Sequence, residues 1–71
     1  MRVLVVEDDV ALALFLQKGL KREGHDVECA GDGDVAMEHV QSQCVDLIVL
    51  DLSLPRRDGI EVLKLVRERC P

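Results

Sequence analysis

Two short apolar runs, each ended by acidic residues, constrain the fold of this chain most. Val3–Val6 is followed by Glu7 and Asp8, and Leu47–Leu50 is followed by Asp51. Neither run alternates polar and apolar side chains, which is typical of strands buried on both faces of a parallel sheet. A chain that contains such strands needs helices between them to cover the two faces.

The residues after the first run predict a helix. It is expected to extend from Val10 to about Glu23, with Asp9 as its N-terminal cap and Gly24 as its C-terminal stop. The residues at helical spacing on its expected inner face are Leu12, Phe15, Leu16 and Leu20, and Leu14 lies outside that stripe.

A second strand and a second helix are predicted next. Asp26–Ala30 alternates polar and apolar residues, which is typical of a half-exposed edge strand. Asp32 or Asp34 then caps a helix that continues through about Gln43. The expected inward side chains are Val27 and Cys29 in the strand, and Val35, Ala36, His39 and Val40 in the helix.

The second apolar run is followed by a loop and a third helix. The loop is predicted over 52–58 and contains Pro55. Asp58 is expected to cap a helix from Gly59 to about Arg69, and Pro71 cannot continue it. The expected buried stripe of this helix is Ile60, Leu63 and Val66.

Three strands alternating with three helices predict an α/β fold in one domain that covers residues 1–71. Such an order implies a parallel sheet with right-handed crossovers. The two fully apolar strands suit the interior and the alternating second strand suits an edge, which gives the spatial order 2-1-3. This is the start of a flavodoxin-like sheet, and the chain shows no linker and no repeat.

The acidic residues after the first and third strands predict a metal site. Order 2-1-3 makes these strands neighbours, so Glu7, Asp8 and Asp51 converge beyond their carboxyl ends, where open parallel sheets bind ligands. Carboxylates held this close need a compensating cation, and hard oxygen ligands without His or Cys favour Mg²⁺. A carboxylate beside Mg²⁺ can attack a phosphoryl group and form an acyl phosphate. Asp9 is interpreted as a helix cap only.

Three motifs carry a family resemblance: the Val5–Asp9 strand end, the 30–33 turn and the segment from Asp46 to Gly59. Through them the chain resembles the receiver domains of bacterial two-component response regulators. The resemblance covers the whole chain and implies a phosphoacceptor that takes its phosphoryl group from a sensor histidine kinase. In complete members about five strand–helix units are present. This chain corresponds to the part before strands four and five, without the Ser/Thr and Lys that contact the phosphoryl group there.

The resemblance also implies a role for individual residues. Asp51 corresponds to the phosphoacceptor, Asp8 to a direct Mg²⁺ ligand, and Glu7 to an acid that holds the metal through water. Ser53 stands where a backbone carbonyl completes the metal site. The loop into the third helix is shaped by Pro55 and by the Asp58-Gly59 pair.

Composition excludes several other classes. The net charge of -5 argues against direct nucleic-acid contact by this segment. The resemblance to response regulators implies, through the Glu-Asp form of the acid pair, a DNA-binding output only in a full-length parent. Cys29 and Cys44 are interpreted as small apolar residues of a reducing compartment, since no Cys-x-x-Cys pair occurs. The chain shows no signal peptide and no apolar run long enough for a membrane span, so a cytoplasmic location is expected.

Two weaker motifs are given structural interpretations. The 31–36 stretch matches G-x-G-x-x-A, but Asp32 and Asp34 would repel a pyrophosphate there. We therefore expect a turn in which glycine supplies unusual backbone angles. His25 and His39 have no partner visible in the sequence, which favours a surface and a semi-buried histidine respectively.

Two functions remain open. The first is a phosphoacceptor module that is no enzyme beyond its own phosphorylation and dephosphorylation. The second is a truncated receiver that acts only by dimerisation or partner binding. We expect a homo-oligomer, because nothing in the chain can pair with the outer edge of the third strand. A phosphatase with a carboxylate nucleophile is disfavoured, because Ser53 occupies the position of its second Asp.

Overall fold

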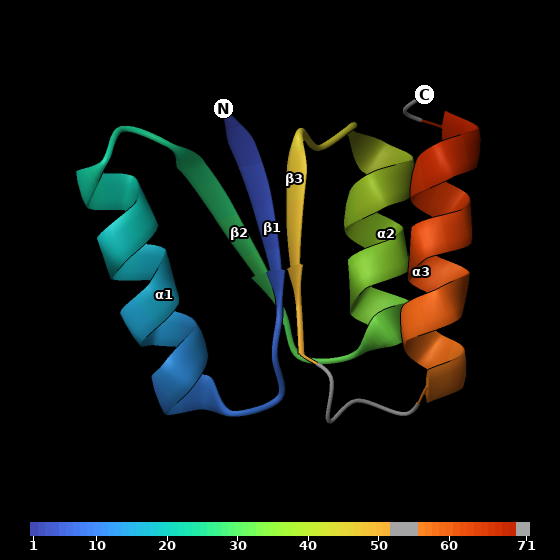
Figure 1. Cartoon of the computed structure of the whole chain (residues 1–71), viewed down its shortest axis with the longest axis horizontal. Coiled ribbons are helices and arrows are strands. Elements are labelled where there is room, and N and C mark those ends of the chain that lie inside the picture. The colour runs from blue at the N-terminus through green and yellow to red at the C-terminus, as the bar shows by residue number, and fades with distance from the viewer. Residues whose placement is uncertain (52–55, 70–71) are drawn as a thin grey trace.

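A computed structural model of the chain describes residues 1–51 and 56–69, and for 56–58 it describes only the backbone. Strands and helices alternate in this part as the sequence predicts (Figure 1). The elements are β1 (Arg2–Val6), α1 (Val10–Arg22), β2 (Asp26–Ala30), α2 (Gly33–Ser42), β3 (Leu47–Leu50) and α3 (Arg56–Arg69). None of the helices in the described part combines the length and the apolar character needed to cross a bilayer.

The three strands form one parallel sheet in the order β2-β1-β3, which confirms the predicted topology. Val6, at the end of β1, is in register with Ala30 of β2 and Leu50 of β3. The carboxyl ends of all three strands therefore lie at one edge of the sheet. Figure 1 shows α1 on one side of the sheet, and α2 and α3 together on the other.

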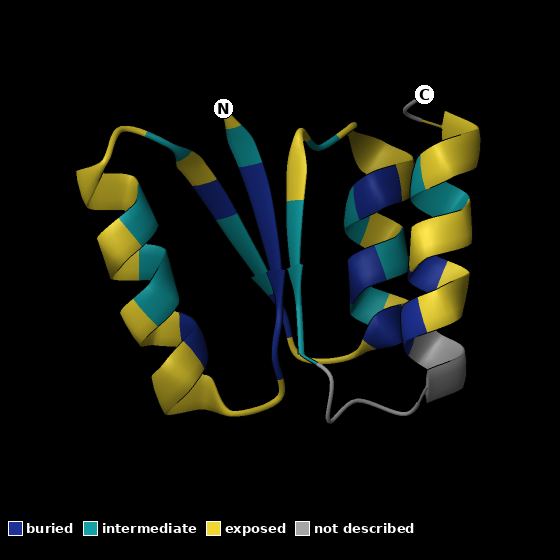
Figure 2. Ribbon diagram, in the orientation of Figure 1, coloured by how far each residue is buried: buried dark blue, intermediate teal, exposed yellow. Residues whose placement is uncertain are grey.

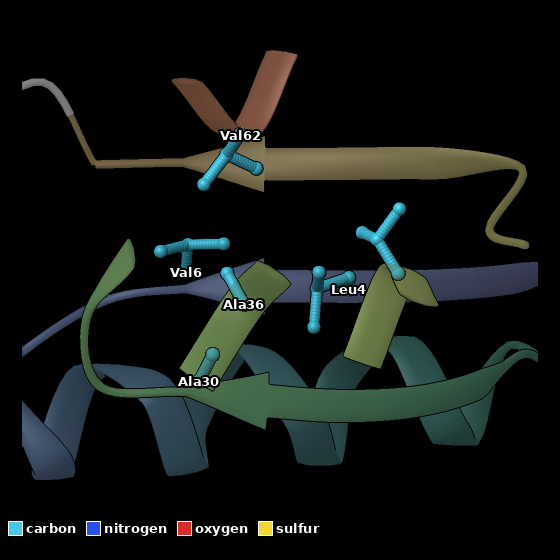
Figure 3. Close-up of a cluster of buried hydrophobic side chains, with 6 residues drawn as sticks. Leu4, Val6, Ala30, Ala36 and Val62 are labelled. Carbon is cyan, nitrogen blue, oxygen red and sulfur yellow. The ribbon is translucent and has the colours of Figure 1, made fainter. Parts of the chain in front are cut away.

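The central strand β1 supplies most of the core, and Figure 2 shows it almost entirely buried. Leu4 and Val6 pack toward α2 and α3 with Ala36 and Val62, as Figure 3 shows. The alternate side chains of β1 pack with Val27 and with α1 on the other face. β1 is buried on both faces because it lies between two strands and has helices on each face of the sheet. This burial confirms the interpretation of its apolar run.

The ends of α1 agree with the sequence, whereas part of its inner face does not. Asp9 caps the helix, with its Oδ1 accepting the Leu12 N–H at 3.1 Å. Gly24 follows the helix with φ of 93°, and its N–H donates to the Lys21 carbonyl at 3.0 Å. Phe15 was expected inside but is 73% exposed.

The contact of α1 with the sheet is narrower than its apolar surface. Ala13 is buried, and Leu16 and Leu20 pack against the core. These positions follow i, i+3 and i+7, so they form one stripe, and Leu12, predicted to be inside, lies beside it and is 44% exposed. Leu14 is exposed, as predicted.

The structure settles which acid caps α2. The Oδ1 atom of Asp32 accepts the Val35 N–H at 2.9 Å, and Asp34 lies in the first turn. The inward positions are confirmed, with Ala36 and Val40 buried. The expected unusual glycine angles are wrong here, because among the described residues only Gly24 has positive φ.

Both histidines are half-buried, so the surface position expected for His25 is wrong and the semi-buried position of His39 is confirmed. The Nδ1 atom of His39 pairs with one carboxylate oxygen of Glu28, and Arg2 pairs with the other. This network joins β1, β2 and α2 beside the core. It brings together residues distant in sequence, which is why the pattern of residues did not indicate it.

The third helix begins earlier than predicted and turns a different face to the core. It starts at Arg56, so Asp58 lies within the helix and is not its cap. Val62 is fully buried, whereas Ile60 and Leu63, expected to be buried, are 43% and 47% exposed. Apolar residues occur on more than one face of α3, so packing against α2 and the sheet selects the buried one. The predicted loop segment 52–55, with Pro55, lies outside the described residues.

Two further expectations are corrected. The β3 strand is half-buried and Leu47 is 45% exposed, because in the described part β3 pairs only with β1 and forms an edge of the sheet. Cys44 is exposed and disulfide-bonded, so its interpretation as a small apolar residue is wrong. Cys29 is half-buried, and burial raises the pKa of its thiol, partly offset by the charge of Lys21.

Candidate metal centre

Backbone hydrogen bonds at the ends of β1 and β3 hold the acidic residues of the site in place. The N–H of Asp51 donates to the Val6 carbonyl at 3.0 Å, and the N–H of Glu7 donates to the Ala30 carbonyl at 2.9 Å. The hydrogen bonding of the sheet thus extends one residue beyond the ends of β1 and β3. The acidic residues are held on neighbouring strands at the same edge of the sheet.

The three predicted acids converge in the structure. Glu7, Asp8 and Asp51 each offer a carboxylate oxygen, and these oxygens all lie within 4.8 Å of one another. Glu7 is buried at 8% exposure, Asp51 is half-buried and Asp8 is exposed. The site therefore has a buried floor and an open side, which suits a ligand that enters from solvent.

The electrostatics of the cluster centre on Glu7. A hydrogen bond with the Asp51 side chain is the largest cause that raises the pKa of Glu7, followed by burial and by the nearby charges of Asp51 and Asp8. The backbone N–H of Asp9 donates to Glu7 Oε1 at 3.3 Å and partly opposes this shift. The hydrogen bond and burial, with a smaller contribution from the neighbouring charges, favour the neutral form of Glu7 over its charged form.

The donor set fits a hard divalent cation. All three ligating atoms are carboxylate oxygens, the atoms that Mg²⁺ prefers, and Mg²⁺ uses few protein ligands and keeps water or phosphate oxygens in its other positions. A cation would offset the repulsion among these carboxylates, which contributes to the raised pKa of Glu7 after the hydrogen bond with Asp51 and burial. Ser53, the fourth residue of the expected site, lies outside the described residues.

An apolar cleft of about 310 Å³ adjoins the acids on the α1 side of the sheet. Glu7 and Asp51 line its polar end. The remaining lining residues are Val5, Val6, Leu12, Leu16, Val49 and Leu50. This apolar wall accounts for the burial of Glu7. The role of the Ala30 carbonyl in holding Glu7 was missed at the sequence level, although the order 2-1-3 already puts the end of β2 beside β1.

The profile of the response regulator receiver domain family matches residues 3–71 of the sequence. The chain belongs to this family. The receiver-domain identity agrees with the resemblance drawn from the motifs, and the acidic cluster lies at the carboxyl ends of β1 and β3, where the motifs placed it.

Named relatives of this receiver domain are transcriptional regulators. The chain is 44% identical over 68 residues to the alkaline phosphatase synthesis transcriptional regulatory protein PhoP of Bacillus subtilis (strain 168), covering 96% of this chain and 28% of that protein. It is 46% identical over 68 residues to the transcriptional regulatory protein DltR of Streptococcus agalactiae serotype III (strain NEM316), covering 96% and 30% respectively. The chain thus spans less than a third of the length of these relatives.

A solved structure supports the same fold. The response regulator TrrA of Thermotoga maritima, crystallised with Mg²⁺ and BeF, superposes with a TM-score of 0.81 at 32% identity. The match covers 97% of this chain and 60% of that one. The flavodoxin-like receiver fold is therefore shown for the part of the domain that the chain contains.

Proposed function

We propose that this chain is the phosphoacceptor part of a two-component response regulator, in which Asp51 receives a phosphoryl group from a sensor histidine kinase. The observation that carries the proposal is the cluster of Glu7, Asp8 and Asp51 oxygens within 4.8 Å at the carboxyl ends of two adjacent parallel strands. A carboxylate nucleophile beside a cation site is the arrangement that acyl-phosphate chemistry requires.

The proposed roles follow the position of each acid. Asp8 is exposed and would bind Mg²⁺ directly, together with Asp51. Glu7 is buried behind them and would hold the metal through water. The backbone carbonyl of Ser53 would complete the ligand set. The crystallised complex of TrrA with Mg²⁺ and BeF supports this choice of metal.

The phosphoryl transfer requires little from the protein beyond holding the reacting groups in position. An oxygen of Asp51 attacks phosphorus, the new O–P bond forms, and the P–N bond to the donor histidine breaks with its electron pair left on the imidazole. Bound Mg²⁺ supplies positive charge against the phosphoryl oxygens. The chain would act on no separate substrate, so we class it as a phosphoacceptor that promotes only its own phosphorylation and dephosphorylation.

The setting of the proposed function is the cytoplasm, where such a kinase presents its phosphohistidine. The net charge of -5 supports a segment that makes no direct nucleic-acid contact. A DNA-binding output would belong to a longer parent protein. The names of PhoP and DltR as transcriptional regulators, and the greater length of both, support that arrangement.

Phosphorylation of Asp51 is the direct test. Incubation with acetyl phosphate and Mg²⁺ should add the mass of one phosphoryl group, and peptide mapping after borohydride reduction should locate it at Asp51. Asp51→Asn should abolish the modification, because the amide is not a nucleophile of this kind. The exposed Asp34→Asn, a matched loss of one charge on α2, should leave it intact. Label that persists in Asp51→Asn would remove Asp51 from the proposed role.

Binding of Mg²⁺ can be tested without phosphorylation. Titration of the metal-free chain with Mg²⁺, followed by backbone amide NMR, should move the signals of Glu7, Asp8 and Asp51. Lys18 and His25, near the far end of the sheet, should not respond. Asp8→Asn should raise the Kd by at least about tenfold, because the loss of a group that only supports a metal ligand already costs about that much. A response confined to residues outside the cluster would show that the metal site is assigned wrongly.

A second candidate function is association through β3. Among the described residues this strand pairs with β1 alone, and its four side chains are all apolar. An unpaired apolar edge without Lys or Pro is a template for another strand. We propose that two copies pair along this edge to form a homo-oligomer, which would let a chain without productive phosphotransfer still act as an interaction module.

A further inference from the structure

Gly59 of α3 lies close to Leu50, the last residue of β3. It is buried near the start of α3, and a Cβ atom built on its backbone would lie 3.2 Å from Cδ2 of Leu50. Ordinary contacts between carbon atoms are about 3.5–4.0 Å. By contrast, a Cβ atom on Gly19, Gly24 or Gly31 would meet nothing within 4 Å. A side chain at position 59 would therefore have to push Leu50 by a few tenths of an ångström.

Leu50 is linked to the acidic cluster through the backbone of β3 and β1. It is the last residue of β3, it precedes Asp51, and its partner in register is Val6. Val6 precedes Glu7, and its carbonyl accepts the Asp51 N–H. The Leu50 side chain packs against the cluster that contains Val6 and Val62, both of which are fully buried. Leu50 is half-buried and packs on this close-packed cluster, so a displacement of its side chain away from position 59 would be passed in part to the backbone at the end of β3.

Helix stability does not account for glycine at this position. Glycine in a helix interior is less favourable than alanine, because it loses more conformational freedom on folding. Position 59 lies inside α3 and its φ is not positive, so no special backbone angle requires glycine there. In the described structure, the closeness of Leu50 is the feature that explains a glycine at position 59.

We infer that Gly59 is a positioning residue for Asp51: by carrying no side chain, it lets α3 close on Leu50 and holds the end of β3 in the register that keeps Asp51 beside Glu7 and Asp8. Reactive groups must be held within about 0.5 Å of their working geometry, which is the scale of the displacement at issue. The phosphorylation of Asp51 rests on the proposed function, whereas the effect of Gly59 on the position of Asp51 is independent of it.

The test compares four variants with the wild-type chain. Gly59→Ala adds the Cβ atom, and Leu50→Val removes the δ-methyl groups that it would meet. The double variant restores the space, and Gly19→Ala, at an exposed position in α1, is the matched control for glycine replacement. Backbone amide NMR of the metal-free chains reports the position of Asp51 and Glu7. The Kd for Mg²⁺ from the same spectra reports the consequence.

Gly59→Ala should shift the amide signals of Asp51 and Glu7, and should raise the Kd for Mg²⁺ by about threefold or more, since small misplacements at a reactive centre are costly. Gly19→Ala should leave both unchanged while raising the folding equilibrium constant by about fivefold. The double variant should recover the wild-type signals and Kd of the site. A merely structural role for Gly59 would change stability without this local, reversible pattern.

Unchanged site signals in Gly59→Ala would overturn the inference, whatever happens to its stability. A double variant that folds but stays perturbed would show that Leu50 is not the route. If Gly59→Ala fails to fold, a folded double variant with wild-type site signals supports the inference, and an unfolded one contradicts it. If the wild-type chain binds no Mg²⁺, the proposed function fails, while the metal-free signals still decide the role of Gly59.

Discussion

At the scale of single residues, the raised pKa of Glu7 makes a prediction about pH. The hydrogen bond with Asp51 and burial raise this pKa above its ordinary value of 4.5, so at a pH between the unfolded-state and folded-state pKa values the folded chain holds a proton that the unfolded chain has lost. The stabilising contribution of protonated Glu7 is therefore full below pH 4.5 and is lost as the pH rises through the folded-state pKa. Glu7→Gln, which keeps an uncharged side chain, should escape this loss.

We expect the free energy of unfolding of Glu7→Gln, relative to wild type, to increase as the pH rises from about 4 to about 7 without metal. Urea denaturation followed by circular dichroism across this range measures the difference. Mg²⁺ should reduce this difference, because a bound cation favours the charged form of Glu7 in the wild-type chain. A difference that is equally large in Glu38→Gln, an exposed acid on α2, would assign the effect to net charge and not to the cluster.

At the scale of elements, the cap of α2 has a predictable effect on stability. The Oδ1 atom of Asp32 accepts the Val35 N–H at 2.9 Å, a donor that has no partner within the helix. Asp32→Ala should lower the free energy of unfolding by about 1 kcal/mol, measured by urea denaturation. Asp32→Asn keeps an acceptor oxygen and should stay close to wild type. Equal losses in the two variants would mean that charge near the helix N-terminus matters more than the cap.

At the scale of the whole molecule, the outer edge of β3, which no strand of the described part pairs, predicts self-association. Sedimentation velocity at micromolar concentration should show a dimer for the wild-type chain. Leu47→Lys places a charge on the edge, where Leu47 is 45% exposed, and should give a monomer. Leu14→Lys makes the same change on α1, at 49% exposure, and should remain a dimer. A dispersed wild-type monomer would refute pairing through β3.

The sequence by itself determined the order of the elements, the sheet topology and the convergence of Glu7, Asp8 and Asp51. These features follow from local causes: continuous apolar runs, caps such as Asp9, and the rule that parallel strands end at one edge. The positions of the acids at that edge needed only the strand order, because each acid directly follows its strand.

Only the tertiary structure decided which helix faces are buried. Phe15 in α1 and Ile60 in α3 are exposed, whereas Ala13 and Val62 are buried. Both helices carry apolar residues on more than one face, so periodicity leaves their rotation open, and packing against the sheet and α2 selects it. The pKa of Glu7 and the contact between Gly59 and Leu50 likewise depend on distances between residues far apart in the chain, which no local pattern encodes.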